Sequence, residues 1–118
     1  MHEIIFYVDS KGNRPVFDYM QSLEQKGDKD SRLRLDKVTK YIEKLSEGGT
    51  QIGMPFVKHL DGDIWELRPM RDRILFFAWT NGSYVLLHSF MKKTRKTPRR
   101  EIDRAKRELQ DWIQRGGK

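Results

Sequence analysis

The sequence predicts an α+β domain, in which two N-terminal helices and a C-terminal helix pack on a small, mainly antiparallel β-sheet. Residues 15–47 have apolar side chains at helical spacing, whereas residues 56–91 contain several short strand signals separated by turns. A last helical segment begins near residue 97. Helices and antiparallel strands that occupy separate stretches of a chain are typical of this architecture. At 118 residues the chain has the length of one domain, which we expect to span residues 1–118.

The N-terminal part predicts one strand followed by two helices. Residues 3–8 are rich in β-branched and aromatic side chains, which favour a strand. Pro15 and Gly27 mark a first helix, because proline is favoured at the first helical position and glycine just after the last. A second helix is expected from about residue 30 to 47, where the apolar stripe comprises Leu35, Val38, Ile42 and Leu45. The short interval between the two helices predicts an antiparallel pair.

The middle of the chain predicts antiparallel strands. A tight turn at residues 60–63 precedes a strand at residues 64–68, and further strands are expected at residues 73–79 and 84–90. The dipeptide Asn81-Gly82 between the last two strands is typical of a two-residue hairpin turn.

A final helix is predicted from Thr97, as its N-cap, and Pro98, as its first helical residue. Gly116-Gly117 ends it. Its apolar face comprises Ile102, Ala105, Leu109, Trp112 and Ile113.

A two-residue hairpin turn also predicts which side chains share a face of the sheet. It places Leu75 opposite His88 and Arg73 opposite Phe90, and side chains then alternate between the two faces. One face is apolar apart from Ser89, so we expect helices to cover it; its members are Ile74, Phe76, Ala78, Val85, Leu87 and Met91. The other face comprises Arg73, Leu75, Phe77, Trp79, Tyr84, Leu86, His88, Phe90 and Lys92.

The net charge of +7 lies entirely in the last quarter of the chain. Residues 88–118 contain eleven Lys or Arg and four Asp or Glu, whereas residues 1–87 contain thirteen of each kind. Six cations with no acid among them are Lys92, Lys93, Arg95, Lys96, Arg99 and Arg100. A local positive field attracts polyanions, of which nucleic acid is the commonest partner. A solvated basic tail is the alternative interpretation, but this cluster lies between a strand and a helix.

The composition excludes several functional classes. The chain has no cysteine, which excludes a disulfide scaffold, a thiolate metal site and a cysteine nucleophile. His2, His59 and His88 are scattered without metal-ligand spacing, so we expect no metal and no other cofactor. The longest apolar run, residues 74–79, is too short to span a bilayer, and the N-terminus has no signal-peptide pattern. We therefore expect a cytoplasmic protein that does not bind a membrane.

One end of the predicted sheet brings together cations that suit the phosphates of a nucleic acid. Arg73 is the candidate clamp on the phosphate oxygens, since a guanidinium matches them bidentately. Arg68 would hold the same or the neighbouring phosphate, and Lys92 and Lys93 lie at the same end of the sheet.

The residues around these cations suit RNA binding. Phe90 offers an aromatic plane on which an unpaired base stacks, while nearby cations hold the backbone. Arg95, Lys96 and Arg99 belong to the same basic cluster and are candidate RNA-binding residues.

His88 has two interpretations that the sequence leaves open. Histidine gains and loses a proton near neutral pH, which suits a general base. A lone histidine among Leu86, Leu87 and Phe90 equally suits a buried residue with satisfied hydrogen bonds.

Several ordered motifs resemble the phage-derived, Gp49-like branch of the RelE/HigB toxins. They are DGDIWELR at residues 61–68, RILFF at residues 73–77, LHSFMKKT at residues 87–94 and the dipeptide Thr97-Pro98. The resemblance covers nearly the whole chain. It implies the compact RelE-type fold and the toxin of a type II toxin–antitoxin system, an mRNA endoribonuclease that inhibits translation and acts on message in the ribosomal A site.

The resemblance also implies a partner and site residues. The partner is a small helix-turn-helix antitoxin of the HigA kind. Arg73 falls where these toxins place a strand arginine near the scissile phosphate, and Lys92 and Lys93 fall where a second strand-end cation lies. Arg68 is a further position of this kind. In the RNA cleavage that the resemblance implies, the 2′-hydroxyl attacks the adjacent phosphorus, and positioning with electrostatic stabilisation promotes this step without a metal. Either Lys92 or Lys93 would compensate charge on the leaving oxygen. The chain departs from many members because it has no tyrosine after Tyr84, which excludes a C-terminal tyrosine as acid or base.

Few side chains near the cations can act as a general acid or a general base. This favours cleavage that depends on the ribosome, which would present the codon in a strained conformation. Two alternatives use the same basic surface without chemistry. One is a non-catalytic RNA- or DNA-binding module, and the other is a protein-binding element that meets an acidic partner.

Overall fold

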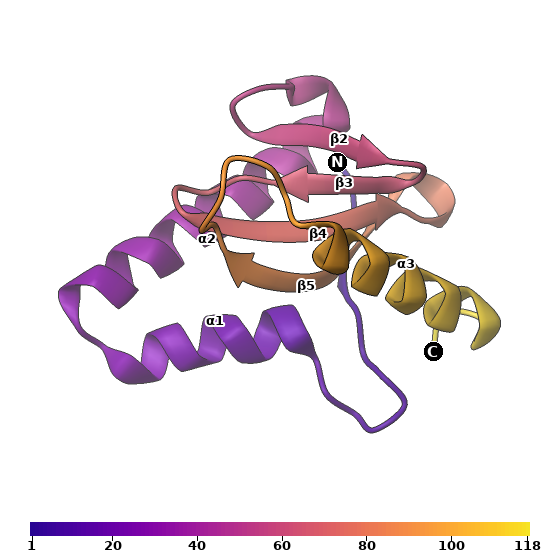
Figure 1. The fold of residues 1–118 in the computed structure, drawn as a ribbon, viewed down its shortest axis with the longest axis horizontal. Coiled ribbons are helices and arrows are strands. Elements are labelled where there is room, and N and C mark those ends of the chain that lie inside the picture. The colour runs from indigo at the N-terminus through magenta and orange to yellow at the C-terminus, as the bar shows by residue number, and fades with distance from the viewer.

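The computed structural model describes residues 1–118 and places a five-stranded sheet between helices (Figure 1). The elements in chain order are β1 (Ile4–Phe6), α1 (Pro15–Lys26), α2 (Lys29–Gly48), a 3-10 turn (Gly49–Ile52), β2 (Val57–Asp61), β3 (Ile64–Leu67), β4 (Asp72–Ala78), a second 3-10 turn (Thr80–Gly82), β5 (Tyr84–Met91) and α3 (Arg99–Gln114). The strand order is β1-β5-β4-β3-β2, and β1 with β5 is the single parallel pair. The predicted α+β class is therefore confirmed.

The ends of the two N-terminal helices follow from local capping chemistry. Helix α1 begins at Pro15 and ends before Gly27, whose φ of 65° lies in the left-handed region that glycine adopts without strain. The Asp28 carboxylate caps α2 by accepting a hydrogen bond from the Ser31 backbone N–H at 3.1 Å. Both helices thus begin and end within two residues of the positions that the sequence predicts.

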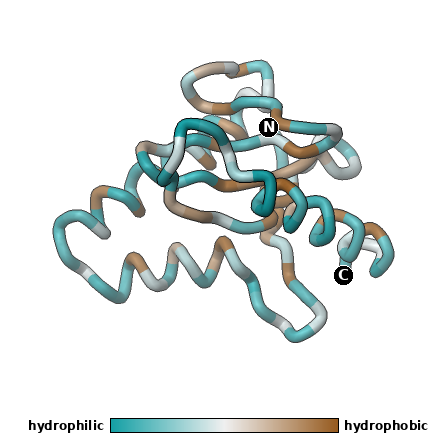
Figure 2. Tube along the Cα trace, viewed as in Figure 1, coloured by the Kyte–Doolittle hydropathy of each residue, from teal (hydrophilic) through white to brown (hydrophobic).

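The sheet separates two apolar cores. The core between the sheet and the α1–α2 pair comprises Val16, Val38, Leu45, Val57, Leu67, Ile74, Phe76, Tyr84 and Leu86. The core between the sheet and α3 comprises Tyr7, Ile64, Leu75, Phe77, Val85, Leu87, Ala105, Leu109 and Trp112. Figure 2 shows that hydrophobic residues recur along the strands, whereas the helices are mainly hydrophilic with single hydrophobic stretches at intervals.

The hairpin between β4 and β5 differs from the predicted two-residue turn. Asn81 and Gly82 have positive φ values of 54° and 74°, but they belong to a longer connection. The Trp79 N–H donates to the Ser83 carbonyl at 2.8 Å, and a 3-10 turn lies between them. A two-residue turn is therefore wrong here, and the pairing next to the connection is displaced by one residue from the predicted register.

A β-bulge restores the predicted register at the far end of the hairpin. The register shifts between Leu75 and Phe76, where Leu87 is the extra residue of β5. Beyond the bulge, Arg73 lies opposite Phe90, as predicted. The end of the hairpin that carries Arg73 is thus correctly predicted although the turn is not.

The bulge also changes which face some β5 side chains occupy. Val85 and Leu87 pack beneath α3, whereas Tyr84 and Leu86 pack beneath α1 and α2. These assignments reverse the predicted ones, because a one-residue displacement moves a side chain to the opposite face.

No helix combines the length and the hydropathy that a membrane crossing requires.

Candidate functional site

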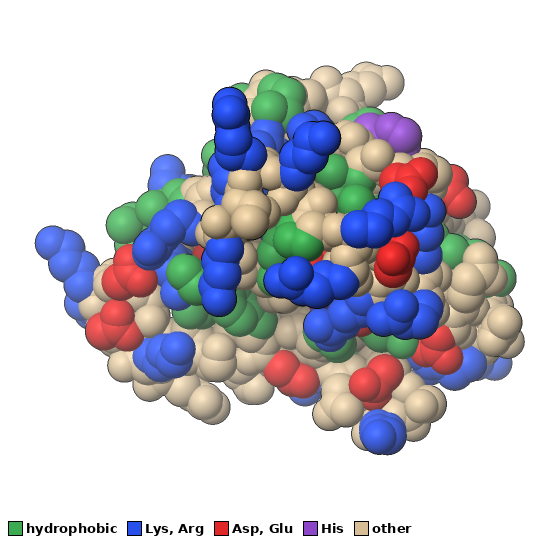
Figure 3. Space-filling model, viewed as in Figure 1, with side chains coloured by type: hydrophobic (Ala, Val, Ile, Leu, Met, Phe, Trp, Pro, Cys, Tyr) green, Lys and Arg blue, Asp and Glu red, His purple; other side chains and the backbone are tan.

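A cleft of about 200 Å³ lies where the ends of β3, β4 and β5 meet the loop between β5 and α3. We call residues 92–98 the basic loop, and the cleft the basic cleft because seven cations line it: Lys58, Arg68, Arg73, Lys92, Lys93, Arg95 and Lys96. Figure 3 shows Lys and Arg side chains gathered on the face of the molecule that carries this loop and α3. A concave surface with one sign of charge concentrates ligands of the opposite sign.

The structure brings together most of the residues that the sequence singled out. Those that line the basic cleft are Arg68, Arg73, Phe90, Lys92, Lys93, Arg95 and Lys96. His88 and Arg99 are not among its lining residues. The Arg99 guanidinium instead donates to Asp61 at 2.7 Å and to Asp103 at 3.1 Å, at the outer side of α3.

His88 is fully buried and its two ring nitrogens face carboxylates. Nδ1 lies 2.5 Å from Glu108 Oε1, and Nε2 lies 3.0 Å from Glu101 Oε1. Both glutamates belong to α3, so His88 connects β5 to that helix. The geometry matches the buried and hydrogen-bonded interpretation of this histidine.

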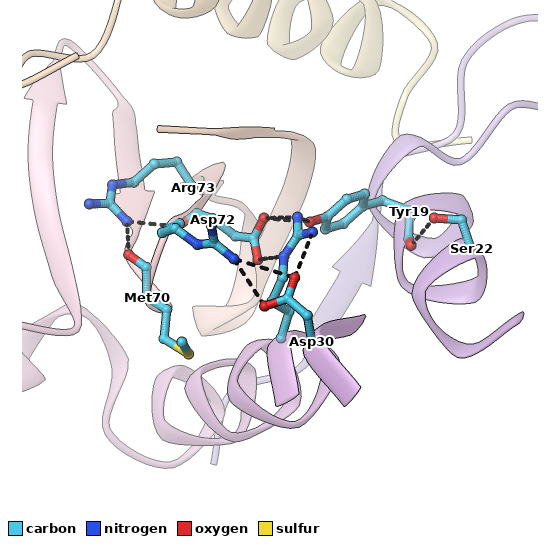
Figure 4. Close-up of polar contacts among 8 residues, drawn as sticks. Tyr19, Ser22, Asp30, Met70, Asp72 and Arg73 are labelled. Carbon is cyan, nitrogen blue, oxygen red and sulfur yellow. Dashed lines mark hydrogen bonds and ion pairs between the residues drawn. The ribbon is translucent and has the colours of Figure 1, made fainter. Parts of the chain in front are cut away.

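Arg73 is held at the floor of the cleft by backbone carbonyls. Its side chain is 7% exposed, and Nη1 donates to the carbonyls of Met70 and Asp72, each at 2.8 Å (Figure 4). Burial lowers the pKa of the Arg73 guanidinium, and the positive charge of Arg68 acts in the same direction. Its Nη2 makes no hydrogen bond within the protein, so this group is available to an anion in the cleft.

Glu66 is a site residue that the sequence reasoning did not single out. Its side chain is 2% exposed, and Oε1 lies 3.4 Å from Arg68 Nε and 3.8 Å from Arg73 Nε. The Thr97 hydroxyl donates to Oε2. The sequence contains a signal for the burial of Glu66, because Glu66 lies two residues after Ile64 in a strand and therefore points to the same face as this apolar residue.

Thr97 does not cap the last helix as predicted. Helix α3 begins at Arg99, the N-cap position is Pro98, and no side chain caps it. The Thr97 hydroxyl is instead engaged by Glu66, on β3. Burying a carboxylate without hydrogen-bond partners costs free energy. This explains why the Thr97 hydroxyl donates to Glu66 on β3 instead of capping α3.

A network behind the cleft fixes the start of β4. Asp72 is 1% exposed and accepts hydrogen bonds from Arg34 Nε at 3.2 Å and Nη2 at 2.8 Å, and from the Tyr19 hydroxyl (Figure 4). The hydrogen bond to Asp72 raises the pKa of Arg34, and burial raises the pKa of Tyr19. Because Asp72 immediately precedes Arg73, this network anchors the cleft floor to α1 and α2.

Asp61 ties the turn between β2 and β3 to α3. Its Oδ2 accepts from Lys106 Nζ at 2.8 Å and from Arg99 Nη1 at 2.7 Å. The hydrogen bonds from these two cations lower the pKa of Asp61 from 3.8 to about 2. The ion pairs hold β2, which contributes one wall of the cleft, against the helix.

The lowered pKa of Asp61 predicts a pH dependence of stability. A carboxylate whose pKa falls on folding stabilises the protein above its unfolded-state pKa and loses this contribution as pH falls through the folded value. We expect the difference in unfolding free energy between wild type and Asp61→Asn to shrink between about pH 4 and pH 2. Urea denaturation at several pH values measures it, and a difference that stays constant over this range contradicts the assignment.

The fold and the cleft define a small α+β protein with a cationic cleft at the open end of a mainly antiparallel sheet. The chain belongs to the phage-derived Gp49-like family, "Phage derived protein Gp49-like (DUF891)", whose profile matches residues 18–110. The predicted Gp49-like membership is thereby confirmed, and the match includes every residue that lines the basic cleft. No curated protein matches the sequence.

Proposed function

We propose that this protein is the toxin of a type II toxin–antitoxin system and an endoribonuclease that cleaves mRNA on the ribosome. The observation that carries the proposal is the convergence of Arg68, Arg73 and the lysines of the basic loop in one cleft. Membership of the Gp49-like family supports it, because the sequence resemblance relates this branch to the RelE/HigB toxins.

The proposed reaction uses the nucleophile of the RNA itself. The 2′-hydroxyl loses its proton and attacks the adjacent phosphorus, the bond to the 5′-oxygen breaks, and that oxygen takes up a proton. The products are a 2′,3′-cyclic phosphate and a free 5′-hydroxyl. Negative charge grows on the phosphoryl oxygens in the transition state, so preorganised cations around the phosphate accelerate the step.

Arg73 and Arg68 are the proposed phosphate ligands. Arg73 is fixed by two carbonyls before any ligand binds, and this preorganisation reduces the cost of ordering it in the transition state. Lys92 or Lys93, at the start of the basic loop, would stabilise charge on the leaving oxygen. Phe90 would support a neighbouring base by stacking.

The outer cations have a supporting role in this proposal. Arg95 and Lys96 are exposed on the basic loop and would contact flanking phosphates, which adds affinity that decreases with salt. Arg99 is engaged by Asp61 and Asp103, so we assign it to the edge of the RNA-binding surface.

We leave His88 out of the proposed catalytic set because it is fully buried between two glutamates. Replacing it with asparagine is expected to lower the unfolding free energy by about 1–3 kcal/mol, since Glu101 and Glu108 lose a buried partner. Cleavage per folded molecule should stay unchanged. Denaturant titration and a cleavage assay on the same samples measure both, and lost cleavage at unchanged stability would restore His88 as a catalytic candidate.

The ribosome and an antitoxin are the proposed partners. A site that relies on arginines and lysines gains from a substrate that is presented in a cleavable conformation, which favours mRNA in the ribosomal A site. This activity belongs in the cytoplasm, where message is translated. A small helix-turn-helix antitoxin is proposed to neutralise the toxin.

Primer extension on an mRNA in a translation extract tests the proposal. We expect in-frame breaks that require both the protein and ribosomes. Comparable cleavage of naked RNA would contradict ribosome dependence. No breaks, combined with salt-dependent RNA binding, would favour the alternative of a non-catalytic RNA- or DNA-binding module.

A further inference from the structure

Glu66 is the one carboxylate among the side chains that line the basic cleft. Strand β3 lies between β2 and β4. Glu66 is paired with Lys58 of β2 on one side and with Leu75 of β4 on the other. A negative charge in this position weakens the attraction of the cleft for a polyanion. Recruitment of RNA therefore does not explain why a carboxylate is buried here.

The contacts of Glu66 indicate what it does instead. Oε1 approaches Arg68 and Arg73 at their Nε atoms, at 3.4 Å and 3.8 Å. Contact through Nε leaves the outer edge of each guanidinium available, and the Nη2 atoms of both arginines make no hydrogen bond within the protein. Two like charges side by side repel each other, and a shared carboxylate between them offsets this repulsion.

The second oxygen of Glu66 acts on the basic loop. Residues 92–96 of this loop are exposed, and the Thr94 hydroxyl bonds only within the loop, to the Lys96 carbonyl at 2.6 Å. The hydrogen bond from Thr97 to Glu66 is the one side-chain hydrogen bond that joins the loop to the sheet. One buried carboxylate thus contacts both the arginines of the cleft floor and the loop that carries the lysines.

We propose that Glu66 is a positioning residue for the basic cleft, which orients the two guanidiniums and, through Thr97, fixes the basic loop. The inference rests on the proposed function where it takes RNA as the anion that binds. The arrangement of the cationic groups around Glu66 does not depend on the proposed function. Glu66 acts through its neighbours, since Oε1 forms ion pairs with the two arginines without a hydrogen bond, Oε2 accepts from Thr97, and its side chain is 2% exposed.

Glu66→Gln separates positioning from charge. The variant keeps the shape of the side chain but removes one negative charge from the cleft, so simple electrostatics predicts equal or tighter RNA binding. Positioning predicts that kcat falls about 30-fold while binding of a 2′-O-methyl oligonucleotide, which cannot be cleaved, is unchanged or tighter. An unchanged kcat, or a loss of kcat that tracks unfolding in a thermal melt, overturns the inference.

Thr97 provides a second variant that leaves the charge untouched. Thr97→Val removes the hydroxyl and is expected to lower kcat about ten-fold, whereas Thr97→Ser keeps the hydroxyl and should retain the wild-type rate. Combined with Glu66→Gln, the valine substitution should add little, because Glu66→Gln already weakens the same connection by replacing its charged acceptor with a neutral one. Asp36→Asn is the matched control, since this carboxylate is exposed and pairs only with Lys40 on α2. Additive losses, or failure of serine to rescue, overturn the role of Thr97.

A measurement without RNA decides the inference if the protein proves not to be a nuclease. Nuclear magnetic resonance of the arginine side chains reports hydrogen exchange and chemical shift at each Nε–H. We expect the Arg68 and Arg73 signals to shift and to exchange faster in Glu66→Gln, and to keep their wild-type values in Asp36→Asn. Unchanged signals overturn the positioning role, whereas absence of RNA cleavage by the wild type overturns only the proposed function.

Discussion

Replacing Arg73 with alanine is expected to reduce the rate of RNA cleavage about a thousand-fold, because one preorganised donor to a transition-state oxyanion contributes roughly this factor. Arg73 is the least exposed cation of the basic cleft and is fixed by the carbonyls of Met70 and Asp72 before RNA binds. RNA affinity should fall only several-fold, since the loss of one phosphate contact among several removes a small share of the electrostatic attraction.

Two further substitutions make this prediction specific. Arg73→Lys preserves the charge but not the bidentate geometry, so we expect it to recover binding and little of the rate. Arg32→Ala removes an exposed arginine of α2 that forms no ion pair, and we expect it to leave the rate unchanged. Primer extension and anisotropy with a non-cleavable oligonucleotide measure the two quantities. Equal breaks from wild type and Arg73→Ala would remove Arg73 from the centre of the site.

Replacing Asp72 with asparagine is expected to lower the unfolding free energy by about 3–5 kcal/mol, the usual cost of breaking a buried ion pair from one side. Asp72 is 1% exposed, and its loss leaves the Arg34 guanidinium, whose side chain is 10% exposed, without its principal counter-charge. Asparagine keeps a single acceptor oxygen, which cannot replace both the oxygen that accepts from the Tyr19 hydroxyl and the oxygen that accepts from Arg34 Nε.

Asp30 is the matched control for this experiment because it contacts Arg34 from the exposed side. Its side chain is 55% exposed and lies 3.9 Å from Arg34 and 3.1 Å from Arg71. Asp30→Asn should change stability by about 0.2–1 kcal/mol, as solvent-exposed pairs do. Urea denaturation of both variants measures the contrast, and equal effects would show that burial does not determine the value of this network.

Local signals in the sequence predict the helices and the end of the sheet that carries the cations. Pro15 and Gly27 set the limits of α1 through backbone preferences that act within a few residues. The pairing of Arg73 with Phe90 was predicted from a two-residue turn and is correct, although that turn is not the one that forms. The error cancels because the bulge at Leu87 compensates for the longer connection, and a bulge of this kind has no signal in a single sequence.

By itself the sequence determined the α+β class, the helix limits and the gathering of cations after residue 87, because each depends on composition or on neighbours along the chain. The tertiary structure decided which of these cations share a cleft, that His88 is buried between glutamates of α3, and that Glu66 and Thr97 meet there. The partners in that last contact are 31 residues apart. The hydrogen-bond partner of a side chain is set by packing in three dimensions. No local pattern therefore reveals that the Thr97 hydroxyl donates to a buried carboxylate instead of capping the helix that follows it.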